Sequence, residues 1–155
     1  MQNLLFEADE AVLPPSRPAA TLTITRGVTR LFGELGLAPL TEFSLPNGRR
    51  ADVVGLGRDG RLAIAEIKSC QADFDADGKW EDYLPFCDIF FFAVADDFPR
   101  EILPGAEGLI IADGFGGAVL REAVERPLVA ARRKAVTLRF ARQAAARTVF
   151  MLNGF

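Results

Sequence analysis

The sequence of 155 residues contains no histidine. Histidine is the usual general base near neutral pH and the commonest protein ligand of transition metals. Its absence excludes Ser-His-Asp and Cys-His triads, H-E-x-x-H proteases and every nuclease that holds its metal through histidine. The chemistry left to this chain is that of carboxylates, lysines and arginines.

Cysteine is scarce as well. Cys70 and Cys87 are the only two, and they lie 17 residues apart. This spacing matches no redox or zinc motif, and two cysteines alone cannot complete a four-ligand zinc site. We expect two reduced thiols.

Long apolar runs are also missing. The strongest one covers residues 89–95, which is the length of a strand, whereas a membrane helix needs roughly 18 apolar residues. The N-terminus carries Glu7, Asp9 and Glu10 where a secretory signal would place a basic and then an apolar segment. We expect no membrane span and a cytoplasmic location.

Half of the residues are hydrophobic and 13 are phenylalanine, so the chain can bury one sizeable core. Residues 1–20 contain three prolines and show no sustained periodicity. The sequence therefore predicts an N-terminal arm over residues 1–20 and a single domain over residues 21–155.

The formal net charge is -3, but the charges are unevenly distributed. Residues 71–113 contain 11 acidic side chains and two basic ones. Residues 130–150 contain six basic side chains and no acidic one: Arg132, Arg133, Lys134, Arg139, Arg142 and Arg147. This asymmetry predicts a basic surface despite the negative total.

Hydrophobic periodicity and turn residues predict an α/β fold in which helices and strands are mixed along the chain. A helix begins at Thr21 and stops at Gly36, and a second one is capped by Asp77. A long C-terminal helix covers about 128–151, with a break at 136–138 as an alternative. The expected strands cover residues 40–45, 50–56, 61–68, 89–95, 108–112 and 118–121.

The turn between the second and third strands fixes how they pair. Gly60 suits the position of a three-residue loop that needs a positive φ, which places Gly57 opposite Arg61. Counting back along both strands then places Asp52 opposite Glu66. Lys68 shares the face of Glu66 by the period-two rule.

Two ionised carboxylates opposite each other, about 5 Å apart at Cβ, repel each other unless a cation lies between them. Magnesium binds one or two carboxylates and keeps water molecules that can react. Asp52, Glu66 and Lys68 therefore predict a divalent-metal site for phosphodiester hydrolysis. The alternative is an ion pair of Lys68 with Glu66 or Asp52 at the end of a strand.

The stretch Arg49-Arg50-Ala51-Asp52, followed by a turn and Glu66-Ile67-Lys68-Ser69, resembles the signature of the PD-(D/E)XK nuclease superfamily. Alanine stands at residue 51, where the signature has proline. Together with Asp73-Phe74, Lys79-Trp80, Tyr83 and Cys87-Asp88, these motifs resemble the MmcB-type DNA-repair family over roughly residues 21–148. The resemblance implies a restriction-endonuclease-like αβββαβ core, with a mixed central sheet between helices.

The resemblance also implies roles for individual residues. Asp52, Glu66 and the carbonyl of Ile67 would hold Mg²⁺ or Mn²⁺, and Lys68 would orient or activate the attacking water. Lys79 or Tyr83 resembles a further polar residue that follows the E-x-K strand. Glu34 resembles a helix glutamate that reaches the metal in some relatives, and its alternative is an ion pair with Arg30.

Three functions follow from these observations. The first is metal-dependent cleavage of DNA in repair. The second is a catalytically silent DNA-binding or accessory module whose acidic middle contacts a repair-protein partner, and the third is hydrolysis or binding of another phosphorylated substrate. The side chains expected to contact phosphates are Arg26, Arg30, Arg49, Arg50, Arg132, Arg133 and Arg139.

Overall fold

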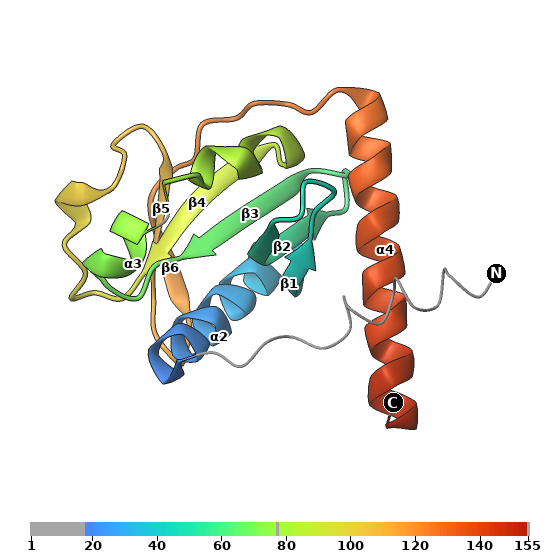
Figure 1. The fold of residues 1–155 in the computed structure, drawn as a ribbon, viewed down its shortest axis with the longest axis horizontal. Helices are drawn as coiled ribbons and strands as arrows, with labels where there is room; N and C mark the ends of the chain where they lie inside the picture. Colours follow the sequence, from blue (N-terminus) through green and yellow to red (C-terminus); the bar gives the residue numbers. More distant parts are fainter. Residues whose placement is uncertain (1–17, 77, 155) are drawn as a thin grey trace.

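The structure is a computed structural model that describes residues 18–76 and 78–154. Its centre is one six-stranded sheet in the order β1-β2-β3-β4-β5-β6 (Figure 1). Strands β3, β4 and β5 are parallel and the remaining pairs are antiparallel, so the predicted mixed sheet is confirmed. The strands are β1 (Leu37–Ser44), β2 (Arg50–Gly57), β3 (Leu62–Ile67), β4 (Ile89–Val94), β5 (Gly108–Ala112) and β6 (Gly117–Arg121).

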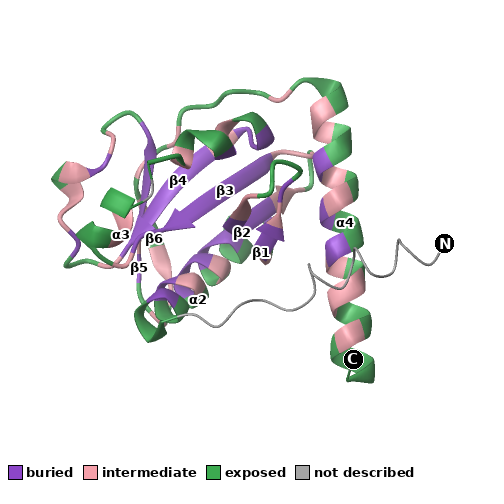
Figure 2. Ribbon diagram, in the orientation of Figure 1, coloured by how far each residue is buried: buried purple, intermediate pink, exposed green. Residues whose placement is uncertain are grey.

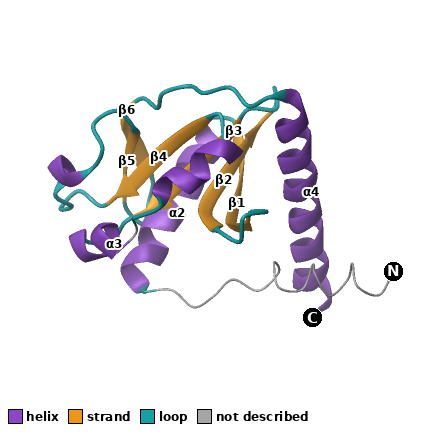
Figure 3. Cartoon of the chain, turned by 45° about the horizontal axis from the view of Figure 1, so that its top comes forward, coloured by secondary structure: helices purple, strands orange, loops and turns teal. Residues whose placement is uncertain are grey.

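Helices flank the sheet (Figure 3). Helix α2 (Ala19–Glu34) starts two residues before the predicted Thr21 and packs on one face. The other face carries α3 (Gln71–Ala76), the 3₁₀ helix η1 (Trp80–Phe86) and the C-terminal helix α4 (Ala130–Asn153). A short 3₁₀ turn, η2 (Arg100–Ile102), lies between β4 and β5.

The period-two rule divides the central strands between two hydrophobic clusters. In β3, Leu62 and Ile64 pack with Phe90 and Phe92 on the face covered by η1 and α4. The alternate residues of β3 pack beneath α2. The core strands are buried along their length (Figure 2), so a polar side chain at the end of β3 lies at the edge of a dry core.

The second predicted helix, capped by Asp77, is confirmed only in part, since a 3₁₀ helix and not an α-helix covers Trp80–Phe86. Asp77 itself lies outside the described residues, and the chain forms the short helix α3 before it and the 3₁₀ helix η1 after it. Pro85 inside η1 has no N–H to donate, which prevents a regular α-helix there. The aromatic stripe still packs inward, since Trp80 stacks on Phe90 with ring centroids 5.7 Å apart.

Helix α4 is continuous, which confirms the predicted long helix, and the alternative of a break at 136–138 does not occur. Val136 is 1% exposed in the core, and this packing outweighs the low helix propensity of a β-branched residue. Farther along α4, Gln143 forms two hydrogen bonds with the backbone of Ser44, of 3.1 and 2.8 Å. Arg147 donates to the carbonyls of Thr41 and Glu42. These contacts cover the free edge of β1.

Two further predictions can be compared with the structure, and a third falls mostly on residues that it does not describe. Both cysteines are free, as predicted, and Cys70 is exposed whereas Cys87 is buried. Within the described ranges, no helix combines the length and the apolar composition needed to cross a membrane. Most of the predicted N-terminal arm, residues 1–17, lies outside the described residues.

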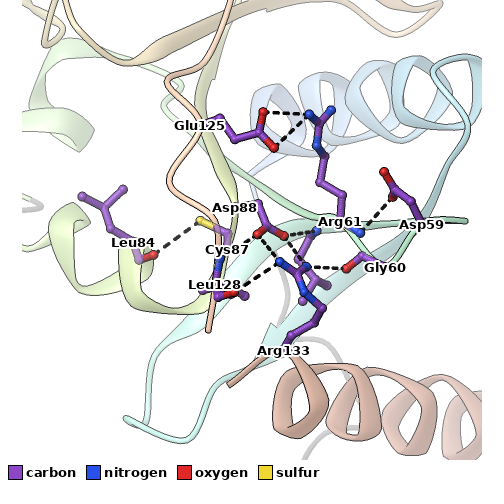
Figure 4. A network of polar contacts seen from close by, with 10 residues as sticks. Asp59, Gly60, Arg61, Leu84, Cys87, Asp88, Glu125, Leu128 and Arg133 are labelled. Carbon is purple, nitrogen blue, oxygen red and sulfur yellow. Dashed lines mark hydrogen bonds and ion pairs between the residues drawn. The ribbon is translucent and has the colours of Figure 1, made fainter. Parts of the chain in front are cut away.

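Asp88 joins four segments of the chain (Figure 4). Its carboxylate accepts hydrogen bonds from the backbone of Leu62 at 2.7 Å and of Leu128 at 2.9 Å. It also accepts two from the guanidinium of Arg133, at 2.7 and 2.6 Å. Burial alone would raise the pKa of Asp88, but hydrogen bonds from Arg133, Leu128 and Leu62 outweigh it and lower the pKa to about 2.

Replacing Asp88 with asparagine is expected to destabilise the fold by about 2 kcal/mol near pH 7. The stabilisation from the ionised carboxylate is present above its unfolded pKa of about 4, and it is lost as the pH falls toward 2. Chemical denaturation from pH 7 to pH 2 measures this. The stabilities of wild type and Asp88→Asn should converge as the pH falls.

Glu125→Gln is the matched control, because this variant removes an ion pair with Arg61 in which both side chains are more than 40% exposed. It is expected to change the stability by no more than about 0.5 kcal/mol. Equal stabilities of wild type and Asp88→Asn at pH 7 would contradict the proposed role of Asp88.

Candidate functional site

The β2–β3 hairpin has the predicted register. The backbone N–H of Gly57 donates to the carbonyl of Arg61 at 2.8 Å, and Gly60 has a φ of 87°. The pairs Val53 with Ala65 and Val54 with Ile64 follow from this turn. One position beyond the last paired residues, Asp52 and Glu66 come together.

Asp52 extends the hairpin through its side chain. Its Oδ2 atom accepts a hydrogen bond of 2.7 Å from the backbone N–H of Ile67. The side chain thus takes the place of a backbone acceptor, and Asp52 is only 8% exposed. This contact fixes the orientation of the carboxylate at the end of β3.

Glu66 is 5% exposed, and its Oε1 atom has no hydrogen-bond partner among the described residues. Burial raises the pKa of Glu66 well above its usual value, and the charge of Asp52 and a hydrogen bond with Asp52 raise it further. The charge of Lys68 and a hydrogen bond with Tyr83 act in the opposite direction. The two carboxylates therefore favour a protonated Glu66 when no cation is bound.

Lys68 continues the same edge. Its backbone N–H donates to Ala93 at 3.0 Å, which ties the end of β3 to β4. The residue is 4% exposed, a rare degree of burial for a lysine. Its positive charge acts on Glu66, so the three predicted side chains form one electrostatic unit.

A cleft of about 510 Å³ opens onto this unit. The start of α2, the start of β2, the end of β3, α3 and η1 each contribute to its wall. The lining residues are Pro18, Thr21, Arg49, Arg50, Asp52, Glu66, Ile67, Lys68, Ser69, Asp73, Ala76 and Tyr83.

Three further polar residues were predicted at the site, and two of them lie outside the cleft. Tyr83 lines the cleft, and its hydroxyl donates to the carbonyl of Arg50 at 3.2 Å. Lys79 is exposed and is not part of the lining. Glu34 is 60% exposed and pairs with Arg30 at 3.4 Å, as the alternative prediction had it. We therefore omit Glu34 from the candidate metal ligands.

The predicted phosphate-binding arginines fall into two groups. Arg49 and Arg50 line the cleft, and Arg49 pairs with Asp82 at 3.3 Å and lies over the Tyr83 ring. Arg26 and Arg30 are exposed on α2 and are not part of the cleft lining.

The three arginines of α4 that were predicted to contact phosphates are partly buried against the body of the protein. Arg133 forms an ion pair with the buried carboxylate of Asp88 at 2.6 Å, and its contact with phosphate stays a prediction. Arg132 lies over the ring of Phe86, 4.7 Å from its centroid. The Nε atom of Arg139 is buried without a partner among the described residues. Some of the basic side chains of α4 therefore pack against the core.

Sequence reasoning missed two features near the site. Asp73 lines the cleft and accepts hydrogen bonds from the backbone and hydroxyl of Ser69, at 3.0 and 3.4 Å. Glu42, on β1, is 5% exposed and has a positive φ of 52°. Burial lowers the pKa of Arg147. The charge of Glu42 raises this pKa, and the charge of Arg50 lowers it further. The only signal for Asp73 was its place in the family motif.

Glu66→Gln is expected to stabilise the metal-free protein by about 1 kcal/mol, or about 3 °C in Tm. In the metal-free protein the Glu66 carboxyl must either stay charged beside Asp52 or take up a proton, and both cost free energy, whereas the amide does neither and can donate a hydrogen bond to the Asp52 carboxylate. Thermal unfolding in EDTA at pH 7.5 measures the change. Glu34→Gln, at an exposed position, serves as the control, and a lower Tm for Glu66→Gln would contradict the repulsion described above.

Comparison with known proteins identifies the family of this chain. No curated protein matches the chain. A solved structure described as the SPO1766 protein of unknown function from Silicibacter pomeroyi is 40% identical, with a TM-score of 0.86 over 90% of this chain and 95% of that one. The family described as DNA repair protein MmcB-like matches residues 8–153. The chain therefore belongs to the MmcB-like DNA repair protein family.

Proposed function

We propose that this protein hydrolyses phosphodiester bonds in DNA with a divalent cation held by Asp52 and Glu66. The observation that carries the proposal is the Oε1 atom of Glu66, which has no hydrogen-bond partner among the described residues and is buried beside a second carboxylate, in a residue of the cleft wall. An acceptor buried without a partner costs free energy. Coordination of a cation would give the Oε1 atom a partner and would also offset the repulsion between Glu66 and Asp52.

The donor set suits magnesium or manganese. Oxygen ligands from one or two carboxylates, completed by water and phosphate, are the usual coordination of Mg²⁺. Asp52 and Glu66 would supply the carboxylates and Ile67 its carbonyl, while the absence of histidine fits a hard cation. When bound, the ion would act as a Lewis acid and lower the pKa of a water molecule.

The protein side chains would orient the reactants. The backbone N–H of Ile67 holds Asp52 through a hydrogen bond, so this carboxylate is oriented before substrate binds, and Tyr83 acts on Glu66 in the direction that favours the charged carboxylate. The ammonium of Lys68 would position the attacking water or a phosphate oxygen. The water oxygen forms a bond to phosphorus, the bond to the leaving sugar oxygen breaks, and the two protons of the water pass to the leaving oxygen and to solvent.

The charge of the cleft is consistent with a phosphate ligand. Arg49, Arg50 and Lys68 balance Asp52, Glu66 and Asp73 in number along its wall. A bound divalent ion would make the cleft positive, and the N-terminus of α2, with no acidic residue in its first turn, adds to this. DNA as the substrate is inferred from the family description. The order of the motifs resembles the PD-(D/E)XK superfamily and supports the same reaction.

One observation favours a second function. Within residues 18–76 and 78–154, no group of three or more acidic or cysteine side chains could hold a metal ion. A site with two carboxylates binds cations more weakly than a site with three. This favours a DNA-binding accessory module, in which Asp52 and Glu66 no longer support hydrolysis and the protein acts through a repair partner.

A cleavage assay distinguishes the two functions. Wild type is incubated with plasmid, single-stranded and branched DNA in Mg²⁺ or Mn²⁺, and we expect it to cut at least one of them. Asp52→Ala and Lys68→Ala should each lower the rate by about 100-fold or more, because each removes a group that acts in the transition state. Glu125→Ala, outside the cleft, should cleave like wild type.

DNA binding, followed by fluorescence anisotropy in EDTA, accompanies the cleavage assay. Wild-type protein that binds DNA but leaves every substrate intact would establish the accessory function instead. Equal cleavage by Asp52→Ala and wild type would contradict the assignment of the site.

A further inference from the structure

Phe115 is the one exposed phenylalanine in the described part of the chain. Its side chain is 84% exposed, whereas the phenylalanines of β4 are buried. It lies in the turn that joins β5 to β6. An aromatic ring in solvent is costly, so its surroundings indicate what could cover it.

The turn that carries Phe115 is held by hydrogen bonds. The Oδ1 atom of Asp113 accepts from the backbone of Phe115 at 2.8 Å and of Gly116 at 3.1 Å. The backbone N–H of Asp113 donates to the carbonyl of Gly116 at 2.9 Å. The backbone around Phe115 is therefore fixed, and a ligand that covers the ring has no loop to order.

Helix α2 packs closely against the turn that carries Phe115. A Cβ atom placed on Gly27 would lie 2.1 Å from the carbonyl oxygen of Asp113 and 2.6 Å from that of Gly116. Only glycine allows this close approach between helix and turn. Thr23, one helical turn earlier, lies beside Gly114, where an added Cβ would be 3.4 Å from its methyl group.

The turn lies at the same edge of the sheet as the carboxylates. Strands β3, β4 and β5 are parallel, so their C-terminal ends, and the residues that follow them, meet along one edge. Two strand spacings, about 10 Å, separate the end of β3 from the end of β5, and Phe115 lies three residues beyond the end of β5. The two strand ends are thus about three base steps of a stacked strand apart. The start of α2 joins the two places, since Thr21 lines the cleft and Thr23 meets the turn.

The charges around Phe115 allow a nucleic acid to approach. The carboxylate of Asp113 is engaged in the turn, and Asp96 at the end of β4 pairs with Arg100 at 2.6 Å. Arg26 is exposed on α2, the helix whose Gly27 contacts the turn. Sites that bind single strands combine basic groups, which contact the phosphates, with aromatic rings, which stack on the bases.

We propose that Phe115 stacks on an unpaired base of a DNA strand whose phosphate lies in the Asp52–Glu66 cleft. This inference rests on DNA being the substrate of the proposed function, and it adds a substrate class to it. Bases within a duplex are already stacked on each other and cannot cover the ring. Single strands, gaps and frayed ends are therefore the expected ligands, in preference to intact duplex.

The test measures the binding of single-stranded oligonucleotides and of a blunt duplex by fluorescence anisotropy in EDTA, where no cleavage occurs. Phe115→Ala should weaken single-strand binding by about 5- to 100-fold, and Phe115→Trp should preserve it. Both variants should leave duplex binding within about twofold of wild type. Oligonucleotides that contain 2-aminopurine should lose fluorescence on binding to wild type and not to Phe115→Ala.

Phe115→Leu separates base stacking from general apolar contact, because leucine has no aromatic face. Val129→Ala, at a residue that is 72% exposed at the start of α4, is the control and should bind like wild type. Recovery of full affinity by Phe115→Leu, or equal binding by Phe115→Ala and wild type, overturns the inference and points to a protein contact at Phe115. Wild-type binding without cleavage removes the proposed hydrolysis and leaves the stacking inference standing.

Discussion

Two carboxylates opposite each other at the end of a buried hairpin impose the constraint around which this structure is organised. Asp52 and Glu66 are each less than 10% exposed, so their repulsion is weakly screened by solvent. The hairpin register leaves them no other position, because a shift by one residue would turn every apolar side chain of β2 and β3 to the wrong face. The β2–β3 packing and the charged site are therefore fixed by the same pairing of strands.

The fold compensates for this unfavourable site with contacts made elsewhere. Asp88 connects β3, β4, the segment before α4 and α4 itself through a buried network. Gln143 and Arg147 attach the same helix to the edge of β1. None of these three residues is part of the cleft lining. Stability and the candidate chemistry thus depend on different residues, which is the usual arrangement when an active site is locally strained.

Local patterns predicted what depends on local geometry. The period of β2 and β3 and the glycine turn between them sufficed to place Asp52 beside Glu66, because both signals act within a few residues. The α-helix expected after Asp77 is a 3₁₀ helix instead, because Pro85 cannot donate a backbone hydrogen bond and the aromatic pattern also fits 3₁₀ geometry. Arg133 could not be assigned from sequence, since its partner Asp88 lies 45 residues away. The exposure of Phe115 likewise depends on how α2 packs against a distant turn.

The central claim is that Asp52 and Glu66 together bind a divalent cation. It is tested most directly by a crystal soaked in Mn²⁺ and measured by anomalous diffraction. The account predicts an anomalous peak within about 2.0 to 2.3 Å of oxygen atoms from both carboxylates. A map with no peak at this position, in which the ammonium of Lys68 bridges the two carboxylates, would contradict it.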